Sequence, residues 1–570
     1  MSTPNAPAQH IVAVIGGATA GAEVASRLSE AGIRVVVFEM NPRPFGKIED
    51  GLPRWHHGLR HKEYETIGEK LAQAGVEYVP NTKIGRDVSF EALAREWGFS
   101  AVILANGAWR DRPLPVEGAD QYVGKGLIYQ NPFIIWFNHC EEKDYAGERF
   151  VPEDGALVVG GGLASIDVVK VHMLETTRAK LRARGIEQDM IELEVKGIPK
   201  SLEKHGIKWE ELGLAGCTLF YRRRAEDMPL AEIPDDADEK RKEKILGARR
   251  RLLEKAQEKY GFRVEALAAP ESLLVENGRV VGLRLRRTKF ENGKLVSTGE
   301  LFERRGPYVI SSIGSIPEPI PEIATKGELF AFTDWEIGRL AGYPSVFSVG
   351  NVVTGKGNIV ASRKHAAEVY EVALASFLGV SGDGHQAEAA LASGAAAAAG
   401  AQAAKIAAEI GRAAPPSGAT ALAILARVHE RQRAVGYTGD VKSWLERVTP
   451  LDVSCAWLLS RGGAAGGGGE WLAAAPVIIR GAAVARSREL TAVLGSWGPS
   501  LRLISPPPPP APPRLLVPCV EVRRWEEGRG SARPRAAPPA CASRALTERA
   551  MVSSLSRCIR RSACETQVRL

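Results

Sequence analysis

The chain has 570 residues, of which 45% are hydrophobic and 25% are charged, a composition typical of globular proteins. No run reaches the roughly 18 apolar residues that a membrane helix needs, so we expect no membrane partner. The net charge of +8 does not indicate a nucleic-acid partner, because residues 453–570 hold 17 arginines and 7 acidic residues. The first 452 residues hold 58 basic and 60 acidic residues, which is close to neutral.

The cysteines exclude several kinds of redox and metal site. Only Cys140 and Cys217 precede residue 453, and no C-x-x-C pair occurs in the chain. We therefore expect no reactive dithiol, no iron–sulfur ligand set and no zinc ribbon. A reducing, cytoplasmic location is the corresponding expectation.

A β–α–β unit is predicted at the N-terminus. Residues 11–16 (IVAVIG) read as a strand, residues 16–21 (GGATAG) as a glycine turn that opens an amphipathic helix, and residues 34–39 as a second strand. Such a turn holds a dinucleotide pyrophosphate at the helix N-terminus. Glu39, at the end of the second strand, is placed to accept hydrogen bonds from a ribose diol. Ala18 stands where a second glycine is expected, and its methyl group would crowd the pyrophosphate.

A second unit of the same type begins at residue 156. ALVVGGG (156–162) is a strand that runs into a glycine turn, and the next strand, 217–222, follows a helical segment and an insertion of about 40 residues. Where an NAD site places an acid, this chain has Arg222-Arg223-Arg224, whose guanidinium groups suit the 2′-phosphate of NADP. Two such turns in one chain indicate two dinucleotides, and hence a flavoenzyme that a nicotinamide reduces.

The rest of the chain changes character twice. Residues 263–313 alternate strands with Asn-Gly turns, and a strand at 345–350 precedes a glycine-rich turn and a helix at 360–378. Residues 386–450 are Ala-rich and then mixed, which indicates helices or a linker. Beyond residue 452, runs of glycine and proline predict a disordered, low-complexity tail.

Seven segments together resemble the adrenodoxin-reductase type of ferredoxin–NADP reductase, in the superfamily that includes the glutamate synthase small subunit. The resemblance covers about residues 10–380. The segments are VVVFEMNPRPFG (35–46), IGRDVSFEAL (84–93), AVILANGAWRDRPLPVEGAD (101–120), GGGLASIDV (160–168), TLFYRRRAEDMP (218–229), YVISSIGSIP (308–317) and VFSVGNVVTGKGNIVAS (346–362).

The resemblance implies an α/β fold with two Rossmann-like dinucleotide-binding domains, the NADP domain being inserted in the FAD domain. The predicted limits are 1–150 and 315–380 for the two parts of the FAD domain, 151–314 for the NADP domain, 381–452 for an Ala-rich helical extension and 453–570 for the disordered tail.

The resemblance also implies the residues that contact the two cofactors. The FAD contacts are Gly16, Ala20, Gly21, Glu39, Ile84, Gly350, Asn351, Gly357, Asn358 and Ile359. The NADP contacts are Gly161, Gly162, Leu163, Ala164, Arg222, Arg223 and Glu232. His61 matches approximately a histidine near the flavin, and Lys47 departs from the family pattern by replacing an apolar FAD neighbour. No catalytic residue is assigned, and His61 is the candidate for such a role. No metal site is expected.

The implied activity is transfer of a hydride from NADPH to FAD and of electrons onward to a ferredoxin-type carrier. One alternative is an electron-input flavoprotein like the glutamate synthase small subunit, or a reductase of a small organic acceptor. Another is a non-catalytic nucleotide-binding module, which Ala18 and Asn351 would suit. The sequence leaves the oligomeric state open.

Two other features carry weaker hypotheses. His56, His57 and His61 could chelate a metal, but no cysteine or paired carboxylate completes a site, and we interpret His56 and His57 as solvated loop residues. The charged run 235–258 is interpreted as a solvated helix face.

Overall fold

The computed structural model describes residues 9–143, 145–230, 233, 237–354, 378, 380 and 389–450. The predicted turn 357–359, residues 360–377 of the predicted helix, Glu232 and the predicted tail lie outside the described residues.

Five parallel strands form the first sheet, in the order β19-β4-β1-β2-β3. The strands are β1 (Ile11–Ile15), β2 (Arg34–Phe38), β3 (Val76–Val79), β4 (Ala101–Leu104) and β19 (Val346–Ser348). They are rich in valine and isoleucine because both faces are covered, so each strand reads as a continuous apolar run. Helices α1 (Thr19–Glu30) and α3 (His57–Leu71) share one apolar core with one face of this sheet.

A second parallel sheet has the order β6-β13-β7-β8-β9. The strands are β6 (Leu127–Tyr129), β7 (Leu157–Gly160), β8 (Thr218–Tyr221), β9 (Arg263–Ala266) and β13 (Val309–Ser312). The sheet begins ahead of the predicted limit at residue 151, because β6 is its edge strand. Helix α4 (Gln130–His139), α5 (Leu163–Ala183), α6 (Met190–Lys196), α7 (Ile198–Glu203) and α8 (Glu239–Tyr260) share one core with it.

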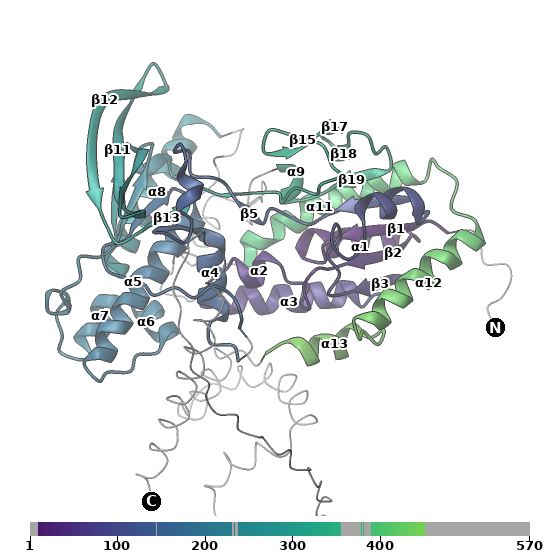
Figure 1. Ribbon diagram of the computed structural model, residues 1–570, viewed down its shortest axis with the longest axis horizontal. Coiled ribbons are helices and arrows are strands. Elements are labelled where there is room, and N and C mark those ends of the chain that lie inside the picture. The colour runs from purple at the N-terminus through teal and green to yellow at the C-terminus, as the bar shows by residue number, and fades with distance from the viewer. Residues whose placement is uncertain are drawn as a thin grey trace, which may run out of the picture. The chain divides into compact units, whose positions relative to one another are not determined.

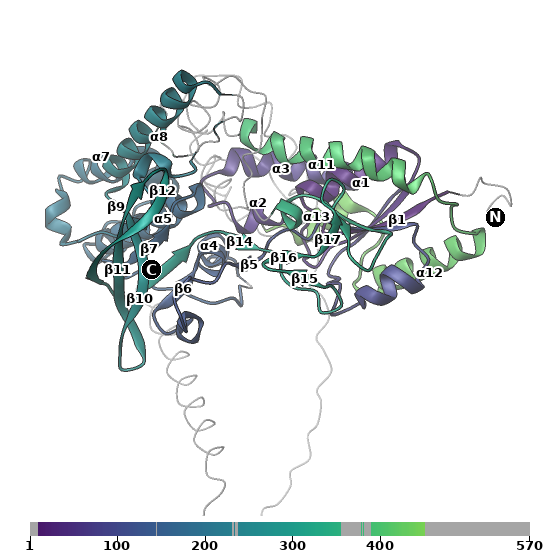
Figure 2. The same cartoon turned by 90° about the horizontal axis from the view of Figure 1, so that it is seen from above.

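An antiparallel sheet covers the other side of this second sheet. It consists of β10 (Ala268–Glu276), β11 (Arg279–Glu291) and β12 (Lys294–Arg305), seen in teal in Figures 1 and 2. Leu283 and Leu285 of β11 pack with Leu157 and Val159 of β7 in one apolar cluster. The β-rich interpretation of residues 263–313 is therefore confirmed.

Two short strands carry the chain between the two sheets. β5 (Arg110–Asp111) follows β4, and its antiparallel partner β14 (Ser315–Ile316) follows β13. The second sheet is thus built from chain inserted between β4 and β19 of the first. The predicted α/β class with two Rossmann-like sheets is confirmed, while the predicted domain limits stay predictions.

Three helices after residue 388 pack on the first sheet and its helices. They are α11 (Ala389–Ile410), α12 (Gly418–Ala434) and α13 (Val441–Val448). α11 runs beside α1 in both views (Figures 1 and 2), and Ala399 and Ala403 are buried in the same core. Gln432 of α12 donates from Nε2 to the carbonyl of Tyr78 at 2.9 Å. The Ala-rich segment is therefore helical and folded against the first sheet, because its small side chains allow close helix contact.

The remaining elements are short. The short α-helices are α2 (Lys47–Asp50) and α9 (Asn351–Thr354). The π-helical turn is η1 (Ala92–Glu96), and the 3-10 helices are η2 (Ala119–Tyr122), η3 (Trp209–Leu212) and η4 (Ala225–Asp227). The short strands are β15 (Thr325–Lys326), β16 (Leu329–Phe330), β17 (Phe332–Asp334) and β18 (Arg339–Leu340). In the part of the chain that the structure describes, no helix has the length and apolar content needed to cross a bilayer.

Candidate functional site

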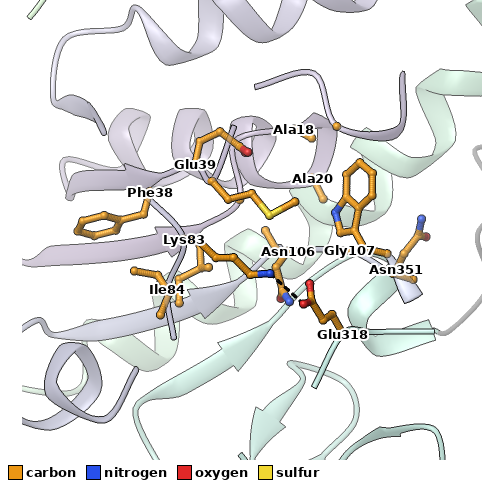
Figure 3. A pocket seen from close by; sticks show the side chains of 18 of the residues that line it. Ala18, Ala20, Phe38, Glu39, Lys83, Ile84, Asn106, Gly107, Glu318 and Asn351 are labelled. Atoms are coloured by element: carbon orange, nitrogen blue, oxygen red, sulfur yellow. Dashed lines mark hydrogen bonds and ion pairs between the residues drawn. The ribbon is translucent and has the colours of Figure 1, made fainter. Parts of the chain in front are cut away.

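A cavity of about 460 Å³ opens at the carboxyl ends of the strands of the first sheet, which is where open α/β sheets bind ligands. Its walls come from segments that are far apart in the sequence (Figure 3). They are the first glycine turn (15–20), the end of β2 (38–40), residues 45–48, the loop after β3 (82–86), the loop after β4 (105–109), residues 318–321 and residues 349–351.

The first turn needs glycine at its first and last positions, Gly16 and Gly21. Gly16 has φ +103°, and a Cβ there would lie 2.6 Å from the carbonyl oxygen of Ala105. A Cβ on Gly21 would lie 1.9 Å from the carbonyl oxygen of Gly16. Strand β1, its turn and helix α1 therefore approach each other more closely than any side chain would allow.

Ala18, whose methyl group was expected to crowd the pyrophosphate, lines the cavity at the start of α1. It is the N-cap of α1 with φ −74°, an ordinary conformation for alanine. Its methyl group faces Gly46, where an added Cβ would lie 2.8 Å away. The absence of a side chain at Gly46 thus provides the room that Ala18 uses.

A second close backbone approach is made by Gly350, which follows the edge strand β19. Gly350 has φ +72°, and a Cβ there would lie 2.9 Å from the Cβ of Ala20. This contact holds the start of α9 beside the start of α1, so Asn351 joins Ala20 in the cavity wall. The structure thereby brings together predicted residues from positions 16–21 and 350–351.

Glu39 is buried at the end of β2, with 5% of its surface exposed. Oε2 accepts a hydrogen bond from the amide of Gly17 at 2.8 Å, and Oε1 accepts one from the amide of Asn41 at 2.9 Å. Burial raises the pKa of Glu39 to about 7, although these amides oppose the shift. The carboxyl group is thus fixed beside the turn, with lone pairs left to accept from a diol.

These features fit a long dinucleotide. Helix α1 has no acidic residue in its first turn, so its free N–H groups and dipole favour a pyrophosphate there. Figure 3 shows Phe38, Glu39 and Ile84 toward one end of the cavity, and Asn106, Gly107 and Asn351 toward the other. A ligand with its ribose at Glu39 and its pyrophosphate at α1 would extend its second half toward Asn351.

The second turn is also closely packed. A Cβ on Gly160 would lie 2.5 Å from both the Ser165 Cβ and the Ser312 carbonyl, and one on Gly161 would lie 2.3 Å from the ring of Tyr221. Gly162 is the N-cap of α5 and has open space around it. Gly161 and Gly162 therefore form the turn, whose outer side at Gly162 is accessible to a ligand, while Leu163 and Ala164 begin α5.

The three arginines after β8 differ in what they contact. Arg224 makes two hydrogen bonds to Asp227, at 2.9 and 3.0 Å, and lies over the ring of Phe290. Arg223 is 4.0 Å from the same carboxylate. The guanidinium of Arg222 is exposed and makes no ion pair with the residues that the structure describes. Arg222 and Arg223 are therefore the arginines with capacity to bind an anion.

The predicted histidines are not part of the cavity. His61 is half-buried on α3, packs edge-on against Tyr64 and does not line the cavity. The interpretation of His56 as a solvated loop residue is wrong: it is fully buried and its Nε2 accepts from Trp55 Nε1 at 3.0 Å. It is buried because it is the N-cap residue of α3 and stands beside Trp55 and close to Leu59, which belong to the core. Within the described ranges, no group of three or more His, Cys, Asp or Glu side chains is arranged so that it could hold a metal ion.

Several cavity residues had no sequence signal of their own. Trp109 follows β4, and Lys83 follows β3 and makes a 2.8 Å ion pair with Glu318 in the cavity wall (Figure 3). Both lie just past the carboxyl end of a strand of the first sheet. That position is the signal that could have identified them, because side chains in such loops line the ligand crevice.

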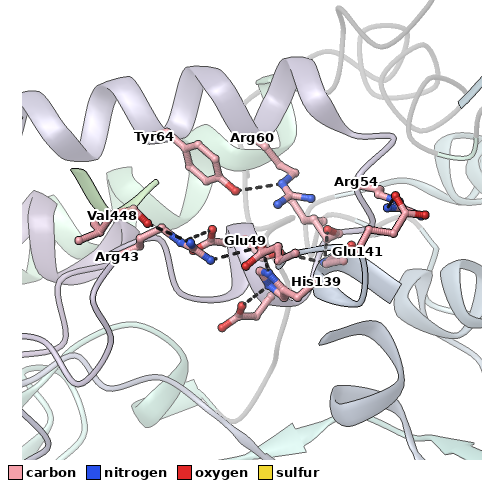
Figure 4. Close-up of polar contacts among 12 residues, drawn as sticks. Arg43, Glu49, Arg54, Arg60, Tyr64, His139, Glu141 and Val448 are labelled. Atoms are coloured by element: carbon pink, nitrogen blue, oxygen red, sulfur yellow. Dashed lines mark hydrogen bonds and ion pairs between the residues drawn. The ribbon is translucent and has the colours of Figure 1, made fainter. Parts of the chain in front are cut away.

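A polar cluster beside the cavity fastens α2 to α4 (Figure 4). His139 Nε2 is 2.8 Å from Asp50 Oδ1, and its Nδ1 is 2.5 Å from Glu142 Oε1. Arg43 adds a 2.6 Å ion pair to Glu49 and donates to the carbonyl of Val448 in α13. Although burial opposes it, hydrogen bonding to Asp50 and Glu142 raises the pKa of His139 to about 9.

The His139 contacts predict a pH-dependent contribution to stability. Because its folded pKa is raised above about 6.5, the stabilisation is fully present below pH 6.5 and is lost as the pH rises through 9. His139→Gln should lower the free energy of unfolding by about 1.5–3 kcal/mol at pH 6, and the difference from wild type should shrink by pH 9.5. Urea unfolding at both pH values measures this. His429→Gln, at an exposed position, is the control, and a loss from His139→Gln that is equal at both pH values would refute the assignment.

The fold and the two glycine turns define a class of protein with two dinucleotide-binding domains, one inserted in the other. No known family profile matches the chain. The glutamate synthase [NADPH] small chain of Mycobacterium tuberculosis is 26% identical over 369 residues, which are 61% of this chain and 63% of that protein. Cindoxin reductase of Citrobacter braakii is 29% identical over 196 residues, which are 33% of this chain and 40% of that protein. The chain thus spans less than two thirds of these relatives.

A solved structure shows the same fold. FprA of Mycobacterium tuberculosis aligns with a TM-score of 0.51 at 16% identity, over 75% of this chain and 91% of FprA. The predicted resemblance to the superfamily of adrenodoxin reductase and the glutamate synthase small chain is confirmed by these matches.

Proposed function

We propose that this chain is an FAD-containing, NADPH-dependent oxidoreductase that delivers electrons to a ferredoxin-type carrier. The observation that carries the proposal is the opposite charge at equivalent positions of the two units. The acid Glu39 follows the second strand of the first unit, whereas Arg222 and Arg223 follow the second strand of the second unit. An acid suits a ribose diol and arginines suit a 2′-phosphate, so the two sites select different dinucleotides.

In this proposal the cavity at the first sheet holds FAD. Gly16 and Gly21 let the backbone reach the pyrophosphate, Glu39 binds the ribose and Ile84 contacts the adenosine half. Ala20, Gly350 and Asn351 border the other half, and Gly357, Asn358 and Ile359 are proposed from the family resemblance alone. FAD, when bound, accepts a hydride from NADPH and can release the two electrons one at a time. The chain's own contribution is to bind, orient and shield the two cofactors.

The second turn is proposed to hold NADPH. Gly161, Gly162, Leu163 and Ala164 place the N-terminus of α5 at the pyrophosphate, and no acidic residue stands in its first turn. Arg222 and Arg223 would bind the 2′-phosphate. Glu232 is proposed as a further contact from the resemblance alone.

The acceptor is proposed to be a separate protein. The chain contains no C-x-x-C pair, and of the two cysteines in the described residues Cys217 is buried, where burial raises its thiol pKa to about 12. A thiol in that state does not relay electrons. Among the relatives, the name NADPH-Fe(3+) oxidoreductase subunit beta supports electron delivery to iron. The name cindoxin reductase supports electron delivery to a separate partner. We propose that the protein acts in the cytoplasm.

A second candidate is an electron-input subunit of a larger reductive enzyme, which the match to the glutamate synthase small chain favours. Cytochrome c reduction by the purified protein with NADPH distinguishes the two. A rate that depends on added ferredoxin supports the first candidate. A protein that oxidises NADPH with dyes but never with ferredoxin would favour the second.

A further inference from the structure

Lys47 lies in the cavity wall, and its side chain is held by residues from distant parts of the chain. It is the first residue of α2, and Nζ donates to Asn131 Oδ1 at 3.0 Å and to Ser315 Oγ at 2.8 Å. Asn131 itself donates to the carbonyl of Trp109 at 2.9 Å. The position of the ammonium group is therefore fixed by α4, by β14 and by the loop after β4.

The ammonium group carries a charge that its neighbours do not neutralise directly. Both of its hydrogen-bond acceptors are neutral, and Lys47 makes no ion pair with any residue that the structure describes. Burial lowers the pKa of Lys47 to about 8, while Asp111 and Asp50 oppose the shift, so the group is mostly protonated at pH 7. Lys47 is half-buried, and a cation partly removed from water without an ion-pair partner is costly unless a ligand supplies negative charge.

The position of Lys47 indicates which half of a dinucleotide it would meet. Nζ lies 5.7 Å from the ring centroid of Trp109, which follows Asn106 and Gly107 in the same loop. Those residues line the end of the cavity away from Glu39 (Figure 3). With the adenosine ribose at Glu39 and the pyrophosphate at α1, this end receives the half of FAD that carries the isoalloxazine ring.

Reduction creates negative charge at that half. NADPH gives up two electrons and one proton as a hydride and becomes NADP⁺, and the neutral oxidised ring of FAD becomes the anion FADH⁻. We propose that Lys47 is the fixed cation of this cavity, which stabilises the reduced, anionic ring and thereby raises the reduction potential of bound FAD. Charge placed near the flavin ring is one of the means by which a protein sets that potential. This inference rests on the proposed function.

The test is the two-electron midpoint potential of the FAD-loaded protein, measured by chemical reduction against a reference dye. Lys47→Met should shift the equilibrium toward oxidised FAD by about tenfold, which is about 30 mV for a two-electron couple. Lys47→Arg keeps the charge and should stay near wild type. Lys326→Met is the control, since Lys326 is exposed on β15 and does not line the cavity.

A second variant keeps the test decisive if Lys47→Met does not retain FAD. Asn131→Asp places a carboxylate at the atom that Lys47 contacts, so it should also make the potential more negative. A potential that is unchanged in both variants, or an equal shift in Lys326→Met, would overturn the role of Lys47. Because the reductant is chemical, this result does not depend on NADPH. A wild-type protein that holds FAD but is not reduced by NADPH would instead contradict the proposed function.

Discussion

Gly21→Ala should yield a protein that no longer retains FAD. The new Cβ would lie 1.9 Å from the carbonyl oxygen of Gly16, a separation that no relaxed structure allows, so strand β1 and helix α1 must move apart. The pyrophosphate would then lose the amides at the start of α1. We expect FAD affinity to fall by at least about a thousandfold, or about 4 kcal/mol.

The measurement is the FAD content after purification and the Kd for added FAD. Gly418→Ala is the control, because Gly418 begins α12 and has open space around it; this variant should retain FAD and fold normally. Circular dichroism separates loss of the site from loss of the fold. A Gly21→Ala protein with wild-type FAD affinity would contradict the proposal that FAD binds in the cavity at the first sheet.

The double variant Arg222→Ala, Arg223→Ala should lose its preference for NADPH. Each charge-assisted hydrogen bond to a phosphate contributes roughly 1.5–3 kcal/mol, so loss of two raises the KM for NADPH by about a hundredfold or more. The KM for NADH should change little, because NADH has no 2′-phosphate. Steady-state rates with both nicotinamides and a dye acceptor measure the two values.

Arg224→Ala is the matched control for this pair. Its guanidinium is already bound to Asp227, so we expect a smaller effect on NADPH than in the double variant. Equal losses for NADPH and NADH in the double variant would refute the assignment of Arg222 and Arg223 to the 2′-phosphate.

The parts of the fold that could be predicted are those that local sequence encodes. Buried parallel strands read as continuous apolar runs, and the glycines at positions 16 and 21 are required by close backbone contacts, so both units were visible in the sequence. Strand β6 was not predicted, because three residues, Leu127–Tyr129, show no periodicity. Its place in the sheet depends on pairing with β13, far along the chain.

The features that could not be predicted depend on contacts between distant residues. Alanine gives a helix no distinctive face, so the packing of α11 on α1 was not encoded locally. Lys47 was noticed as a departure from the family pattern, but its partners Asn131 and Ser315 are 84 and 268 residues away. His56 was wrongly placed in solvent, because nothing in its sequence neighbourhood reveals Asp167 of α5 near its ring.

The most direct test of the account is an anaerobic titration of the purified protein with NADPH while its visible spectrum is recorded. We expect a yellow protein whose flavin absorbance is bleached by NADPH, and much less effectively by NADH. A colourless protein that cannot be reconstituted with FAD, or a yellow protein that neither nicotinamide bleaches, would contradict it.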